Sequence, residues 1–79
     1  MKLLKKPDVL KLTAKSNTTH YNDIKAGLMT PPVRLGENSV AWPEHEIIAI
    51  NAARIADKSD DEIKALVARL IAERKGGVK

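Results

Sequence analysis

The chain has 79 residues, no cysteine and a formal net charge of +4 at pH 7. Its length fits a single domain and leaves no room for a second. The lack of cysteine excludes disulfide bonds and thiolate metal sites. With one Trp, one Tyr and no Phe, the core has to be built mainly from aliphatic side chains.

The N-terminal segment MKLLKKPDVL has lysines on both sides of one leucine pair, which is unlike the apolar region of a signal peptide. No apolar run approaches the roughly 18 residues that can span a bilayer. We therefore expect a soluble, cytoplasmic protein that does not bind a membrane.

The excess of positive charge lies in the first half of the chain. Residues 1–42 carry seven Lys or Arg and three acidic residues, whereas residues 43–79 carry seven of each. Such an asymmetry is typical of a surface that faces nucleic-acid phosphates. Small basic proteins are common, however, so the charge by itself does not identify a partner.

The first predicted elements are a short strand at Leu3–Leu4 and a helix that ends near Thr13. Pro7 fits the first turn of this helix, where its missing amide costs nothing. Ala14–Lys15 is a turn of the length that joins the two helices of a helix-turn-helix. The inner face of the first helix is expected to consist of Val9, Leu10 and Leu12.

The next segment is typical of the second helix of that motif, which enters the DNA major groove. Ser16 is a good N-cap residue, and Gly27 can adopt the left-handed conformation that ends a helix. The inward face is formed at helical spacing by Tyr21, Ile24 and Leu28. The outward face carries Thr18, Thr19, Asn22 and Asp23, with Ser16 and Asn17 at the exposed N-terminal end. Small polar groups suit the reading of base edges, although an ordinary surface helix would show the same pattern.

A β-hairpin is predicted after this helix. Thr30–Pro32 excludes helix because two prolines remove amide donors. Val33–Leu35 and Val40–Trp42 are short strands, and the residues between them favour a turn. The hairpin has the size of a wing, with Arg34 pointing away from the Val33/Leu35 face toward a phosphate or a minor groove. A hairpin that only covers the core is the alternative; we expect Trp42 to be buried and the turn to be exposed.

Two further helices are predicted, joined by Asp57–Lys58. Pro43 can open the first of them, which is apolar over most of its circumference and is expected to be the most buried helix. Ser59–Glu62 is a capping box that starts the second, which frays at Gly76–Gly77. Alanines on both helices would let them pack closely as a hairpin. The apolar residues of the two helices are Ile47, Ile48, Ala49, Ile50, Ala52, Ala53, Ile55 and Ala56, then Ile63, Leu66, Val67, Leu70 and Ile71.

No catalytic or metal-binding pattern stands out. His45-Glu46 begins like a zinc-protease motif but lacks the second histidine four residues after the first. His20 and His45 are the only imidazoles, and no carboxylate spacing near them suggests a metal site. The acidic run Asp60–Glu62 is explained by the positive end of a helix. We expect no catalytic residues, no metal and no cofactor.

Three motifs together resemble the AlpA family of small phage and genomic-island regulators. They are Ser16-x-x-Thr19-x-Tyr21-x-x-Ile24-Lys25-x-Gly27, Pro32-Val33-Arg34-Leu35-Gly36 and Val40-x-Trp42-x-Glu44-x-Glu46-Ile47. The resemblance implies a mainly α fold with a small β-hairpin, a MerR-like winged helix-turn-helix over residues 3–56. Residues 57–79 would be a C-terminal helical extension within the single domain 1–79. The implied function is that of a double-stranded DNA-binding transcriptional regulator, an excisionase (recombination directionality factor), or both, in a prophage or genomic island.

The chain departs from the family pattern where the family often has positive charge. Positions 17 and 22 are often arginine in the family and are Asn17 and Asn22 here, and the wing tip is Glu37-Asn38 instead of Gly-Arg. These changes weaken the expected hold on phosphates. They could also mark a different base code, since Asn pairs with adenine and Asp accepts a hydrogen bond from cytosine.

The resemblance and the charge pattern lead to one set of expected DNA contacts. Base edges would be read by Asn17, Thr18, Thr19 and Asn22. Phosphates would be neutralised by Lys15, Lys25 and Arg34, helped by Lys5, Lys6 and Lys11, with Ser16 as a backbone contact and Asn38 at the wing tip. His20 would touch a phosphate or pack beside Tyr21, and we favour packing.

One copy would contact few base pairs, so specificity would need repeated sites, a homodimer or an integrase beside it. The alternative is a protein–protein adaptor or antirepressor. It would use the helical hairpin of residues 47–71 as its surface, with Ile63 and Leu70 as contact residues.

Overall fold

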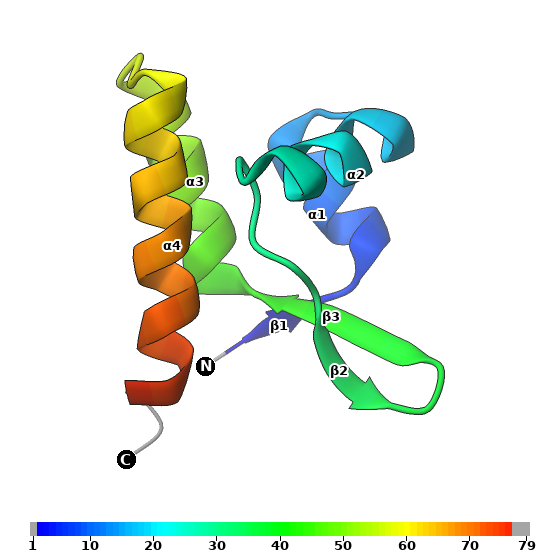
Figure 1. Ribbon diagram of the computed structural model, residues 1–79. Coiled ribbons are helices and arrows are strands. Elements are labelled where there is room, and N and C mark those ends of the chain that lie inside the picture. The colour runs from blue at the N-terminus through cyan, green and yellow to red at the C-terminus, as the bar shows by residue number, and fades with distance from the viewer. Residues whose placement is uncertain (1, 77–79) are drawn as a thin grey trace.

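The computed structural model describes residues 2–76, which form four helices and three strands (Figure 1). The elements in chain order are β1 (Leu3–Leu4), α1 (Lys6–Thr13), α2 (Asn17–Ala26), β2 (Val33–Gly36), β3 (Ser39–Pro43), α3 (Glu44–Ile55) and α4 (Asp60–Gly76). The predicted mainly helical fold with a small hairpin is confirmed. Gly77, part of the predicted frayed end, lies outside the described residues.

Local signals define the ends of α1 and α2. Ala14 follows α1 in the left-handed conformation, with φ 57°. Ser16 is the N-cap of α2, and its hydroxyl accepts a hydrogen bond from the Thr19 amide at 3.2 Å. Gly27 ends α2 with φ 81°, a conformation that strains residues with a Cβ atom. The predicted caps of the second helix are therefore confirmed.

The capping box at the start of α4 is also confirmed. The Ser59 amide donates to Glu62 Oε1 at 3.0 Å, and the Glu62 amide donates to Ser59 Oγ at 3.2 Å. These bonds favour the charged carboxylate and hold the pKa of Glu62 below its usual range. The capping box thus fixes the start of the helix by satisfying two amides that lack helical partners.

The sheet is antiparallel with strand order β1-β3-β2. Leu4 pairs with Trp42 across β1 and β3, and Arg34 pairs with Val40 across the hairpin. The register shifts between Arg34 and Gly36, so Leu35 is an extra residue in β2. This bulge explains why Leu35 is exposed, contrary to its expected place on the inner face with Val33.

A single cluster of buried apolar residues joins the helices and the sheet. Trp42 lies within it and donates from Nε1 to the Thr30 carbonyl at 2.9 Å. The helix α4, predicted as an extension, supplies three members of this cluster. The cluster comprises Leu4, Val9, Met29, Trp42, Ile47, Ile50, Ile63, Val67 and Leu70.

Among the helices of residues 2–76, α3 has the largest share of buried and partly buried residues, as predicted, but it is not covered on all sides. Ile48 is 57% exposed and Ile55 is 86% exposed. The two residues are seven positions apart and therefore share one helical face, while neighbouring elements cover the opposite side through Ile47 and Ile50. Tyr21, predicted to face inward, is also exposed. Two further predicted core positions are exposed as well, Leu12 and Ile71.

A buried ion pair connects α4 to α3 and to the loop before the hairpin. Arg74 binds Glu46 through two hydrogen bonds, Nε to Oε2 at 2.8 Å and Nη2 to Oε1 at 2.7 Å. Arg74 Nη2 also donates to the Pro31 carbonyl at 2.7 Å. Glu46 is fully buried. The pair therefore neutralises a carboxylate that would otherwise lie uncompensated in the interior.

Candidate nucleic-acid interface

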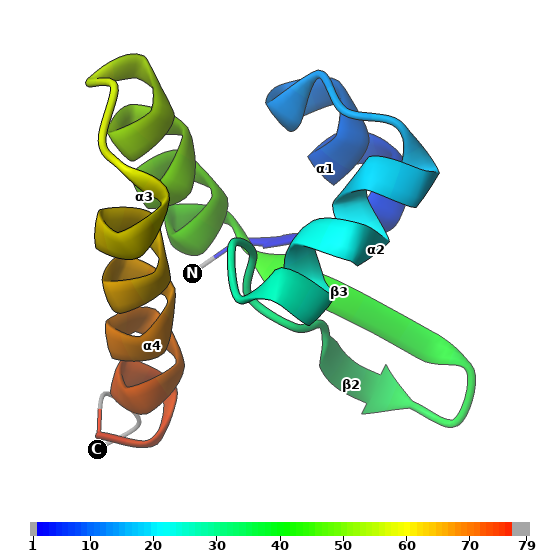
Figure 2. The same cartoon turned by 45° about the horizontal axis from the view of Figure 1, so that its top comes forward.

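The β2–β3 hairpin extends away from α4, whereas the C-terminal end of α2 lies beside α4, with Gly27 facing the side chain of Lys64. Both views show α3 and α4 side by side and the hairpin extending away from them, with α2 near its base (Figures 1 and 2). The arrangement of helices and hairpin is consistent with a winged-helix-like fold. None of the helices described in residues 2–76 combines the length and the apolar character needed to cross a bilayer.

The outer face of α2 is polar, as predicted. The exposed residues of this face are Asn17, Thr18, Thr19, Asn22 and Lys25. Ser16 is exposed too, but its hydroxyl accepts from the Thr19 amide and donates to Thr19 Oγ1 at 3.0 Å. The hydroxyls of Ser16 and Thr19 are therefore engaged with each other at the start of the helix. Among the uncharged side chains of this face, the amides of Asn17 and Asn22 are the largest.

Lys15 and Asp23 face each other and are largely shielded from solvent. The Lys15 ammonium pairs with the Asp23 carboxylate, and only 13% of the Asp23 side chain is exposed. This corrects the expectation that Asp23 points away from the protein. The pairing removes a negative charge from the outer face of α2, and it also directs one of the predicted phosphate-binding lysines toward the protein.

His20 is buried between α2 and the hairpin. Its ring packs edge-on against Tyr21, with centroids 5.5 Å apart, and against Trp42, with centroids 4.9 Å apart. Packing beside Tyr21 was the favoured interpretation, and the structure agrees with it. Because the side chain is 0% exposed, His20 offers no surface to a phosphate and does not belong to the outer face of α2.

Burial lowers the pKa of His20 below its ordinary value of 6.5. The positive charges of Lys6 and Lys15 lower this pKa further, while Asp23 opposes the shift. Neither ring nitrogen has a hydrogen-bond partner among residues 2–76. Protonation would place a charge without a hydrogen-bond partner in the interior, so burial favours the neutral ring in the folded protein.

Acidification is therefore expected to destabilise the fold through His20. The unfolded chain binds the proton at a higher pH than the folded chain, so this contribution to stability is complete above pH 6.5 and is lost as the pH falls below that value. The slope should reach at most about 1.4 kcal/mol per pH unit. Urea unfolding between about pH 5 and pH 8 measures it. His20→Gln should flatten the slope, whereas the exposed His45→Gln should not; equal effects of the two changes would contradict this prediction.

The wing carries Arg34 and Asn38 at exposed positions. The Lys5 ammonium donates a hydrogen bond to Ser39 Oγ, and Lys6 Nζ lies 5.3 Å from the centre of the Tyr21 ring. The basic N-terminal segment is thus held beside both the hairpin and α2. No local pattern in the sequence indicated these contacts, because Lys5 and Ser39 are 34 positions apart.

Metal-binding chemistry finds no support in this part of the chain. Across residues 2–76, no three His, Asp or Glu side chains are grouped so that they could hold a metal ion. The exposed polar groups of α2 and the wing are amides, hydroxyls, cations and the single carboxylate of Glu37.

Comparison with known protein families gives a match to the segment that contains α2 and the wing. Residues 2–49 match the family model described as prophage CP4-57 regulatory protein (AlpA). The chain is also 39% identical over 57 residues to a protein of Enterobacteria phage P4 described as uncharacterized protein ORF88. That match covers 72% of this chain and 65% of the phage protein. No solved structure matches the chain. Since the family model spans β1 through the first half of α3, the chain belongs to the AlpA family of phage regulatory proteins.

Proposed function

We propose that this protein binds double-stranded DNA, with α2 in the major groove and the β2–β3 wing on the adjacent backbone or minor groove. The proposal is carried by the exposed polar residues of α2, a helix that packs through His20 against Trp42 of the hairpin in which Arg34 is exposed (Figure 2). Membership of a regulatory family supports it. The protein would act in the cytoplasm as a transcriptional regulator, as an excisionase beside an integrase, or as both.

The proposed contacts fall into two classes. Base edges would be read by Asn17, Thr18, Thr19 and Asn22, and phosphates would be bound by Lys25, Arg34 and the N-terminal lysines. Asn38 lies at the wing tip and Ser16 at the start of α2. Both would contact the DNA backbone. Lys15 is a weaker candidate than its position suggested because it is paired with Asp23.

Gel shifts on three DNAs test the proposal and distinguish the excisionase role from transcriptional control. Attachment-site DNA, promoter DNA and random DNA would be compared at several salt concentrations, since phosphate contacts make affinity depend on salt. Tighter binding to the attachment site favours the excisionase role, and tighter binding to the promoter favours transcriptional control. A protein that ignores all three at low salt does not have the proposed function.

Arg34→Gln is expected to weaken binding to every DNA by a similar factor and to reduce the log–log salt slope by about 1. The reason is that a phosphate contact adds affinity without reading sequence. Arg69→Gln is the matched control, because Arg69 is an exposed arginine on α4, outside the hairpin and α2. If the two variants bind alike, the wing does not contact the phosphates.

Asn22→Ala is expected to change base preference at one position, by roughly 1–3 kcal/mol. An asparagine side chain that pairs with a base edge discriminates among bases, and its loss relaxes that position only. A set of duplexes with single base-pair changes, measured with wild type and variant, reports the effect. An equal loss of affinity on every duplex would mean that Asn22 does not read a base.

A second candidate function is that of a protein–protein adaptor. The residues first expected to form its surface, Ile63 and Leu70, are buried in the core, so they cannot form the contact. The observation that favours the candidate is the exposed apolar face of α3 at Ile48 and Ile55. An adaptor would lose its biological activity when these two residues become serine and would keep it after Asn22→Ala.

A further inference from the structure

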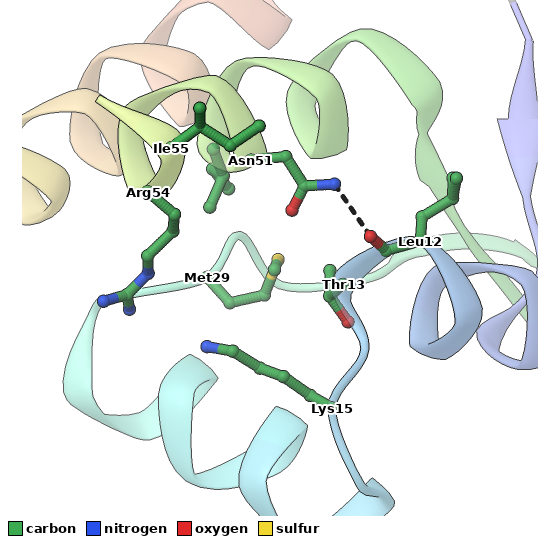
Figure 3. A pocket seen from close by; sticks show the side chains of 8 residues that line it. Leu12, Thr13, Lys15, Met29, Asn51, Arg54 and Ile55 are labelled. Carbon is green, nitrogen blue, oxygen red and sulfur yellow. Dashed lines mark hydrogen bonds between the residues drawn. The ribbon is translucent and has the colours of Figure 1, made fainter. Parts of the chain in front are cut away.

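A cavity of about 350 Å³ lies between α1, α3 and the segment that follows α2 (Figure 3). Its walls are largely apolar and include Met29 and Ile50 in the depth of the fold, with Leu12 and Ile55 at exposed positions. Asn51 Nδ2 donates to the Leu12 carbonyl at 2.9 Å and so joins α3 to α1 beside the cavity. The volume lies near the lower end of the range for small-molecule sites, which limits the occupant to a small molecule.

Each of the two cations at this cavity pairs with a carboxylate that lies outside the lining, Lys15 with Asp23 and Arg54 with Asp60. Lys15 and Arg54 belong to the lining, and no carboxylate is present among the described residues that form it. Figure 3 shows both side chains extending toward the same side of the cavity. An apolar cavity with two cations at one side complements a molecule that has an apolar body and one anionic group.

The existing ion pairs leave both cations able to bind a ligand. Lys15 pairs with Asp23, but an ammonium group has three donors. Arg54 Nη1 lies 3.6 Å from Asp60 Oδ1, and 68% of the Asp60 side chain is exposed, so water screens this pair strongly. A carboxylate could therefore bind both groups without first breaking a strong interaction.

We propose that this cavity binds a small monocarboxylic acid with an unbranched apolar body. The carboxylate pairs with Arg54 and Lys15, and the apolar body lies on Met29 and Ile50 and covers Leu12 and Ile55. This inference does not depend on DNA binding. Because Lys15 immediately precedes the N-cap of α2, the ligand would contact the turn of the helix-turn-helix.

The test is a titration of the whole protein with octanoate, followed by amide nuclear magnetic resonance shifts. Octylamine and acetate serve as matched probes, the first with the same body and opposite charge, the second with the same head and almost no body. Octanoate should cause saturable shifts at residues 12–15 and 50–55, whereas the other two should not. Arg54→Gln should weaken octanoate binding by about five- to tenfold, and Arg69→Gln should leave it unchanged.

Several outcomes would overturn the proposal. Equal binding of octanoate and octylamine would show an apolar surface without charge recognition, and the absence of saturable shifts would show no site. Unchanged octanoate affinity in a folded Arg54→Gln protein would remove the assigned role of Arg54. Because the comparison of the three probes uses wild-type protein, the test does not depend on the folding of any variant. If Arg54→Gln weakened DNA binding and left octanoate binding unchanged, Arg54 would instead be assigned to phosphate contacts.

Discussion

Replacing Arg74 with alanine is expected to lower the free energy of unfolding by about 3–5 kcal/mol. The substitution leaves the fully buried Glu46 carboxylate without its two charge-assisted hydrogen bonds and the Pro31 carbonyl without its donor. For a small domain whose total stability is roughly 5–15 kcal/mol, this loss is a large part of the whole. Urea unfolding monitored by circular dichroism measures it.

The matched control for this prediction is Arg69→Ala on the same helix. Arg69 pairs with Glu73 on the surface at 3.7 Å, with both side chains more than half exposed, and such pairs contribute little. The double variant Glu46→Gln/Arg74→Ala should lose less than the two single variants together, because no buried charge remains. If Arg74→Ala costs no more than Arg69→Ala, the buried pair does not stabilise the fold.

Ile63→Ala is expected to cost about 2–5 kcal/mol, whereas Ile55→Ala should change stability by no more than about 0.5 kcal/mol. Both substitutions remove the same atoms from a helical isoleucine. Ile63 is fully buried in the common core, while Ile55 is 86% exposed, so only the first leaves a cavity. Urea midpoints of the two variants give the comparison.

This pair of variants also measures whether α4 belongs to the common core of the fold. If α4 were a loosely attached extension, losing Ile63 would barely alter unfolding of the rest. A small effect of Ile63→Ala, close to that of Ile55→Ala, would contradict the packing described above. A large effect would mean that the fold of residues 2–56 depends on packing against α4.

Features that depend on neighbouring residues could be predicted from the sequence. The N-cap at Ser16, the left-handed Gly27 and the Ser59–Glu62 capping box each involve groups within four residues of one another. The hairpin followed from two prolines and a turn between short apolar runs. These local signals, read in order, were sufficient for the helix-turn-helix and its wing.

Features that depend on distant residues could not be predicted in the same way. The Glu46–Arg74 pair joins positions 28 apart, and each partner alone looks like a surface charge on a helix. His20 was uncertain for a related reason, since its packing depends on Trp42 of strand β3, which is distant in the sequence. The apolar periodicity of the third helix gave its type but not the side that neighbours would cover, and therefore Ile48 and Ile55 were misplaced.

The candidate site also has features that local spacing predicts and features that depend on distant residues. Outward positions on α2 follow from helical spacing, and Asn17, Thr18 and Asn22 lie where that spacing put them. The roles of charged residues do not follow from spacing alone, because ion pairing depends on what folds beside them. Lys15 shows this, since its partner Asp23 lies eight positions away.

If the protein binds DNA as proposed, the edge-on contact of His20 with Trp42 would have a mechanical consequence. It joins α2 to a strand of the hairpin through two rigid, buried rings, which would resist a change in the separation of helix and wing. A duplex that engages both would have to adapt its own groove width and curvature to that spacing. Easily deformed pyrimidine–purine steps would then be preferred at positions the protein never touches.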